Sequence, residues 1–156
     1  MVNDYLEVGE LMVERLKATL GASFRLIAGE SSLASVSDTG DYAPAAFVIY
    51  GARATAQRSE IRGGNTIIDQ TWIVACIFPN YDPQPGKSGD ETRREAGPAL
   101  AKVIQALHGW RPGRGHQAME FLQDDRYADE SGQTIWALAF GSRYTYCPVD
   151  TLSVAA

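Results

Sequence analysis

The run Thr71 to Phe78 (TWIVACIF) constrains the fold more than any other stretch of this chain. In a strand, successive side chains point to opposite faces of the sheet. The two sets here are Trp72, Val74, Cys76 and Phe78 on one face and Ile73, Ala75 and Ile77 on the other. A strand that is apolar on both faces belongs in the centre of a sheet, covered on both sides by helices or by another subunit. In a chain of 156 residues, such coverage indicates burial in an oligomer.

Strand patterns precede and follow this run. Gly63-Gly64-Asn65 is typical of a tight hairpin turn, because glycine reaches positive φ without steric cost. Arg58 to Arg62 would lead into the hairpin, and Thr66 to Phe78 would return from it. The other predicted strands are Ser23–Ala28, Ala45–Tyr50, Ala118–Asp124 and Thr134–Tyr146, and a small, polar stretch, Gly51–Gln57, follows the second of them.

The last predicted strand separates large side chains from small ones. The large set is Trp136, Leu138, Phe140 and Tyr144, and the small set is Ala137, Ala139 and Gly141. Small side chains let a neighbouring element come close to the sheet. We therefore expect a helix to pack against the face that carries the small set.

Two stretches have the three- and four-residue apolar spacing of amphipathic helices. The first is Asn3–Leu20, with its first residue as N-cap and Gly21 as its stop. The second begins at the capping-box pattern Ser88–Glu91 and ends near Gly109. Pro98 lies inside it and predicts a kink or two abutting helices, because proline removes a hydrogen bond and clashes with the preceding turn.

These patterns together predict an α+β fold, a mostly antiparallel sheet of four to six strands flanked by two main helices. Residues 1–146 would form a single domain, since a chain of 156 residues can bury one substantial core. Residues 147–156 carry no pattern, and we expect a flexible tail or a partner-binding extension.

Charge and cysteine content argue against several classes of protein. The net charge of −5 does not suit a protein whose main task is to bind nucleic acid, which needs clustered Lys and Arg. Cys76 and Cys147 are too few for a disulfide framework, and we expect both to be reduced and buried. No signal-peptide pattern appears, and no apolar run approaches the ~20 residues of a membrane helix. A soluble protein made in a cytoplasm is therefore expected.

Gly86-Lys87-Ser88 lies between a predicted strand and a predicted helix, as in a nucleotide-binding P-loop. That motif needs a glycine five positions before the triplet, so that successive backbone N–H groups surround the phosphates. Tyr81 stands at this position, and Pro83 and Pro85 each lack an N–H. No nucleotide and no other cofactor is therefore predicted.

No other group of residues predicts catalysis or metal binding. His108 is expected at a helix C-terminus and His116 in a loop, without the spacing of metal ligands. No serine lies in a nucleophile-elbow pattern. The acidic residues expected in a solvated turn rather than in a paired-carboxylate site are Asp124, Asp125, Asp129 and Glu130. The chain is therefore predicted not to be an enzyme.

Charged residues in and beside the predicted hairpin are candidates for a contact between subunits. One interpretation is an exposed edge whose charges discourage strand pairing. The other is an arm that forms salt bridges with a neighbouring subunit, which the doubly apolar strand beside it favours. The loop before the second helix is also free to reach a neighbour. The interface candidates are Arg53, Arg58, Glu60, Arg62 and Lys87.

From Ala45 onward, the order of features resembles the tail terminator proteins of long-tailed bacteriophages and of phage-tail-like bacteriocins. The resemblance is one of order and spacing and includes no catalytic signature. The segments that carry it are Pro44–Val48, Gln70–Val74, Leu107–Pro112, Met119–Phe121 and Ile135–Tyr144.

This resemblance implies an α+β subunit that assembles into a hexameric ring. Such a ring caps the tail tube, ends its polymerisation and forms the surface that joins the head. The implied partners are other copies of the chain, the tail tube protein and a neck or head-completion protein, with no membrane involved. Genomic DNA would pass through the lumen without specific binding. The implied location is the virion, after assembly in the bacterial host cytoplasm, and the family supplies no catalytic residues.

Three alternatives stay open from the sequence. The first is another neck or tail component, such as a tail completion or tube protein. The second is a small enzyme with an unrecognised site, which a cluster of titratable residues in a deep pocket would indicate. The third is a generic binding module of the host cell.

Overall fold

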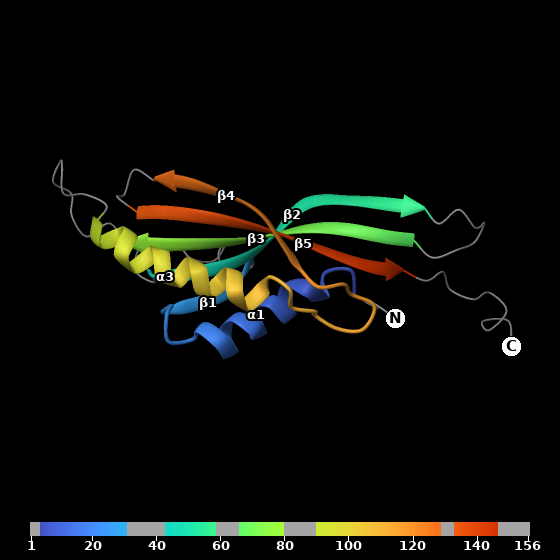
Figure 1. Cartoon of the computed structure of the whole chain (residues 1–156), viewed down its shortest axis with the longest axis horizontal. Helices are drawn as coiled ribbons and strands as arrows, with labels where there is room; N and C mark the ends of the chain where they lie inside the picture. The colour runs from blue at the N-terminus through green and yellow to red at the C-terminus, as the bar shows by residue number, and fades with distance from the viewer. Residues whose placement is uncertain (1–3, 31–42, 59–65, 80–89, 129–132, 147–156) are drawn as a thin grey trace, which may run out of the picture.

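The computed structural model describes residues 4–30, 43–58, 66–79, 90–128 and 133–146 (Figure 1). The sheet and the two helices form an α+β fold, as predicted. The elements in chain order are α1 (Glu7–Leu20), β1 (Leu26–Gly29), β2 (Ala45–Arg58), β3 (Thr66–Pro79), α3 (Asp90–Leu107), β4 (Glu120–Ala128) and β5 (Gln133–Tyr146).

Within the described residues, the sheet has five strands in the order β1-β2-β3-β5-β4, which places β3 at its centre as the apolar run predicted. β1 pairs with β2 in parallel, and all other pairs are antiparallel. Arg58 pairs with Thr66, so β2 and β3 form the predicted hairpin, whose turn lies outside the described residues. β3 and β5 pair over their full length, from Thr66 with Tyr146 to Pro79 with Gln133.

Both described helices lie on the same side of the sheet (Figure 1). The main core lies between the helices and the sheet. Met12 and Leu16 of α1 and Val103 of α3 are fully buried there, with Val74 and Phe140 of the sheet. A smaller cluster on the opposite face comprises Ala28, Ala43, Ala45, Phe47 and Ile77. The expectation of two covered faces is therefore met by helices on one face only, within the described part of the chain.

The prediction for the small-residue face of β5 was wrong. Leu138, Phe140 and Tyr144 on the large-residue face are buried, and the first two belong to the core beneath the helices. The small residues that permit close helix packing lie on α3 instead, where Ala96, Ala99 and Ala106 are buried. Small helix residues against large sheet residues fill the same space as the reverse arrangement, so volume alone did not decide the face.

The start of α1 and the continuity of α3 differ from prediction. α1 begins at Glu7, not at Asn3, because the Asp4 side chain accepts a hydrogen bond from Leu6 N (2.9 Å) and forms a turn there. α3 is a single helix that includes Pro98. Pro98 is exposed, so the backbone carbonyl group that loses its partner lies on the solvent side. Ser88, the predicted cap, lies outside the described residues.

Several strand limits also differ from prediction. Ser23 N donates to Leu20 O, which continues the helix end and delays β1 to Leu26. β2 continues to Arg58 through a register shift between Tyr50 and Ala54, where a polar break was expected.

β4 begins at Glu120 and not at Ala118, because the backbone of Met119 forms its hydrogen bonds with the end of α3. Met119 exchanges hydrogen bonds with the end of α3, donating to Trp110 O (2.8 Å) and accepting from Gly109 N (2.8 Å). Gly109 has φ +79, as its predicted role as a helix stop requires. Asp124 lies in β4, as the predicted strand Ala118–Asp124 requires. Asp125 lies in β4 as well, where a turn was predicted, and both carboxylates are exposed to solvent. Asp129 and Glu130 lie outside the described residues.

Candidate functional site

The structure leaves the predicted interface residues untested. Arg53 and Arg58 belong to β2, but their side chains are outside the described part of the structure. Glu60, Arg62 and Lys87 lie outside the described residues altogether. The same is true of Cys147. These positions remain predictions.

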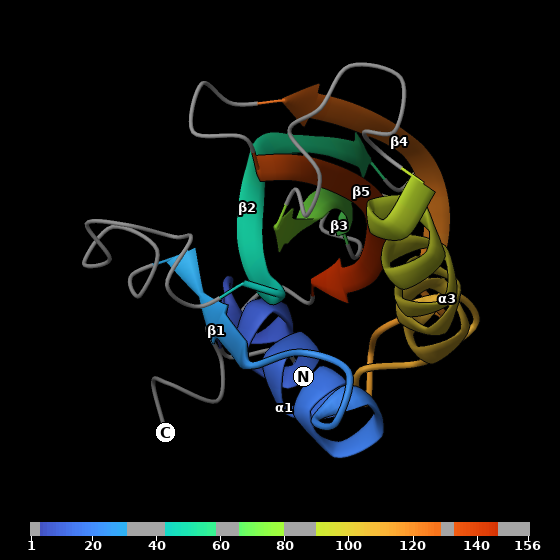
Figure 2. The ribbon, with the colours of Figure 1, turned by 90° about the vertical axis from the view of Figure 1, so that its left-hand side faces the viewer.

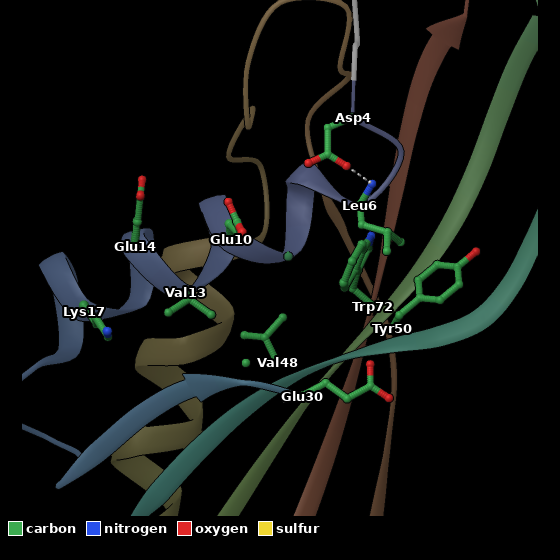
Figure 3. Close-up of a pocket in the computed structure, with 12 residues that line it drawn as sticks. Asp4, Leu6, Glu10, Val13, Glu14, Lys17, Glu30, Val48, Tyr50 and Trp72 are labelled. Atoms are coloured by element: carbon green, nitrogen blue, oxygen red, sulfur yellow. Dashed lines mark hydrogen bonds between the residues drawn. The ribbon is translucent and has the colours of Figure 1, made fainter. Parts of the chain in front are cut away.

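A groove of about 640 Å³ lies between α1 and the β1–β2 edge. We call it the α1 groove. Val13 of α1 and Val48 of β2 lie on its opposite sides, with Tyr50 and Trp72 toward one end (Figure 3). Leu6 lies over Trp72 and is 49% exposed. The groove therefore presents an apolar surface that the described chain leaves open.

The groove depends on a close contact between α1 and the sheet. A Cβ added at Gly9 would lie 2.6 Å from Cζ3 of Trp72, so only glycine lets the helix approach the indole this closely. The buried Gln70 side chain holds the same region, because its Oε1 accepts from Trp72 Nε1 (3.3 Å) and its Nε2 donates to Tyr5 O (2.9 Å). Sequence reading placed these residues in a strand and a helix but had no signal for their contact.

Carboxylates surround the α1 groove. The acidic residues that line it are Asp4, Glu10, Glu14 and Glu30, and Lys17 is the basic residue among them. Figure 3 places Glu10 and Glu14 on the α1 side and Glu30 on the strand side. The rim therefore carries a net negative charge around an apolar floor, which suits a partner with basic groups beside an apolar contact.

The opposite face of the sheet has smaller hollows, one of them lined in part by small side chains. One, of about 470 Å³, is lined by Thr71 and Ile73 of β3, Ala137 and Ala139 of β5, and neighbouring groups. Leu122, which lies at the register shift of β4, is 50% exposed at its border. A second hollow continues along the face toward the cross-strand pair of Arg143 and Asp69. Arg143 Nε donates to Asp69 Oδ1 (2.5 Å), and this hydrogen bond with the Asp69 carboxylate raises the pKa of the Arg143 guanidinium.

His116 lies in the loop between α3 and β4, as predicted, in an isolated bridge with Tyr144. It is 3% exposed, its Nε2 lies 2.7 Å from Oε1 of Glu7, and its ring packs on Tyr144. The contact ties the segment before β4 to the first turn of α1. Sequence could not find it, because 109 positions separate the two partners.

The other titratable groups offer no nucleophile or metal site in the described residues. His108 Nδ1 accepts a hydrogen bond from Phe121 N (3.1 Å), so this ring joins the end of α3 to β4. Burial raises the pKa of Cys76 to about 12, which keeps its thiol protonated. No group of three potential metal ligands occurs within the described ranges. These side chains therefore support the fold.

Comparison with known proteins decides the family. The family model described as phage tail terminator protein matches residues 1–147. The chain belongs to the phage tail terminator family. It is therefore a structural, virion-associated protein of a phage tail, as the resemblance of its strand and helix order implied. No curated protein matches this terminator-family chain.

A solved structure shares the fold of this terminator-family protein. A chain in the structure titled "Virion of native gene transfer agent (GTA) particle" is 17% identical, with a TM-score of 0.54. The match covers 91% of this chain and 99% of that chain. No helix among the described residues is long and apolar enough to cross a membrane.

Proposed function

We propose that this chain is the subunit of a hexameric ring that caps the phage tail tube and ends its polymerisation. The observation that carries the proposal is the match to the terminator family over residues 1–147, nearly the whole chain. The described side chains contribute apolar hollows and charged rims rather than a catalytic group, which suits a protein that acts through its contacts.

A closed ring requires each subunit to present two different surfaces, one to each neighbour. The sheet has two unlike flanks that meet this requirement. α1 lies beside β1 and β2 at one edge, and α3 lies beside β3 and β4 toward the other (Figure 2). We propose that neighbouring subunits meet flank to flank. The hairpin candidates Arg53, Arg58, Glu60 and Arg62, with Lys87, would add contacts between them.

The two ends of such a ring would bind different partners. One would bind the last ring of the tail tube protein, and the other would receive a neck or head-completion protein. The acidic balance of the chain, with a net charge of −5, suits a lumen through which DNA passes without being held. Assembly would take place in the cytoplasm of the bacterial host.

The test is deletion of the gene from the phage or particle that encodes it, followed by electron microscopy of the tails. We expect tails of uncontrolled length that do not join heads, and restoration of a uniform length when the wild-type chain is supplied in trans. Tails of normal length and normal head joining in the deletion would refute the proposed function. Headless tails of normal length would favour the alternative of a tail completion or neck protein.

A further inference from the structure

We propose that the α1 groove is the docking site for α3 of a second copy of this chain. This inference rests on the proposed ring and deepens it, because it assigns the contact between neighbouring subunits to particular residues. The apolar floor of the groove would receive the exposed side of the neighbour's α3. The acidic rim would pair with the basic residues of that helix.

The groove has the composition of a contact surface. Of the three large apolar side chains that are exposed in the described residues, Tyr5 (43%) and Leu6 (49%) lie at or next to one end of it. Clustered exposed apolar groups with a polar border mark interaction surfaces more often than scattered ones do. The border here is acidic, with four carboxylates and one ammonium group. An occupant must therefore bring positive charge on both sides of an apolar or small surface.

The exposed side of α3 has this arrangement. Arg94 and Lys102 are exposed and lie eight positions apart, about 12 Å along the helix axis. Between them, Gly97, Pro98 and Ala101 are also exposed and present little bulk. The helix could therefore approach an apolar floor closely while its two cations reach the rim. Pro98, which costs stability inside a helix, would supply a rigid apolar contact.

The positions of the two surfaces favour a second copy over another occupant. The groove lies on the flank formed by α1, β1 and β2, and α3 lies on the opposite flank with β4 (Figure 2). A contact from one flank to the other uses two different patches and therefore repeats from subunit to subunit. Opposite charge on the two patches opposes the alternative contacts of α1 with α1 and of α3 with α3.

Charge inversion tests the contact. The double substitution E10K/E14K should raise the protein concentration at half-assembly about tenfold or more. The reverse change R94E/K102E should do the same. In an equimolar mixture, the basic groove of E10K/E14K should bind the acidic α3 of R94E/K102E, and the native groove of R94E/K102E should bind the native α3 of E10K/E14K. Assembly should therefore recover with the two variants alternating. The quadruple variant that carries both changes should assemble like the wild type. Analytical ultracentrifugation and native mass spectrometry measure the assembly.

Two controls accompany these variants. D125K inverts an exposed carboxylate that lines the hollow on the opposite face of the sheet, and it should leave assembly unchanged. Thermal unfolding of each variant checks that the monomer folds, which is expected because the four substituted side chains are exposed. Assembly of the wild type should weaken as salt rises, since the proposed contact pairs exposed charges.

The outcomes separate this inference from the proposed function. Recovery of assembly in the quadruple variant, with loss in both double variants, supports the docking of α3 in the groove. Unchanged assembly of E10K/E14K overturns the inference, as does a wild type that stays monomeric at every concentration. Neither result bears on tail length, which the gene deletion measures. If E10K/E14K abolishes tail capping but leaves self-association intact, the groove binds another tail protein and the inference fails.

Discussion

The two faces of the β3–β5 pair carry different kinds of side chain on the same backbone ladder. On the face beneath the helices, large residues oppose each other, as in Trp72 with Phe140 and Val74 with Leu138. On the other face, Ile73 opposes Ala139 and Thr71 opposes Gly141. The first face is covered by α1 and α3, whereas the second carries a small buried cluster at one end and a hollow over Ile73 and Ala139. The difference shows that the face beneath the helices carries the main core of the described chain.

The largest effect should follow from truncation on the helix-covered face. Phe140 is 0% exposed at the centre of the main core. Phe140→Ala should lower the free energy of unfolding by about 3–5 kcal/mol, because it removes buried apolar area and leaves a cavity. Urea denaturation of the purified protein measures the loss. A loss no larger than that of the Ile73→Ala variant below would show that the two faces contribute equally.

A smaller effect should follow from crowding the contact between α1 and Trp72. Gly9→Ala places a methyl group 2.6 Å from the indole, and we expect a loss of about 1–3 kcal/mol as the helix moves away. Gly97→Ala is the matched control, since a Cβ at this α3 position meets nothing within 4 Å. That change should stabilise the helix by up to about 1 kcal/mol. Equal thermal stability of the two variants would refute the close contact.

Truncation on the hollow face should cost less than truncation of Phe140. Ile73 is half-buried there, opposite Ala139. Ile73→Ala should lower the free energy of unfolding of the monomer by about 1–2 kcal/mol, because less area is removed from contact and solvent already reaches the site. The same urea titration measures it. A larger cost in the assembled protein than in the monomer would show that this face is covered in the ring.

The smallest effect should follow from breaking the cross-strand pair of Arg143 and Asp69. The side chains are 43% and 30% exposed, so water and salt screen their attraction. Asp69→Asn should leave the melting temperature of the monomer unchanged within error, at low and at high salt. A clear salt-dependent drop in the variant relative to the wild type would show that the hollow face also depends on this pair.

Sequence patterns predicted the elements better than their packing. The alternation in Thr71–Phe78 and in Thr134–Tyr146 gave the central pair of strands, and the three- and four-residue spacing gave both helices. The predicted ends of the elements were less accurate where a terminal residue forms a backbone hydrogen bond with a distant segment. The backbone N–H of Met119 donates to Trp110 O instead of continuing β4, and no local sequence pattern indicates this hydrogen bond.

Little in the sequence indicated the α1 groove. Glu10 and Glu14 were only the polar side of an amphipathic helix, and Gly9 was an unremarked glycine within it. The sequence pointed instead to charged residues of the hairpin and the loop, which remain predictions. The groove is formed by residues that lie far apart in the sequence, and a pattern within one segment does not show how close another segment lies. They come from Asp4–Lys17, Gly29 and Glu30, Val48 and Tyr50, and Trp72.

The sequence by itself determined that a doubly apolar strand would be central and that two helices would flank a mostly antiparallel sheet. It also showed that the P-loop-like triplet lacks the glycine that the motif requires. Its order of elements also pointed to the terminator family. Tertiary structure alone decided which face of the sheet the helices cover, because either face of β5 could have been filled to the same packing density. It also brought His116 to Glu7 and opened the groove beside α1, since such contacts depend on how distant segments pack together.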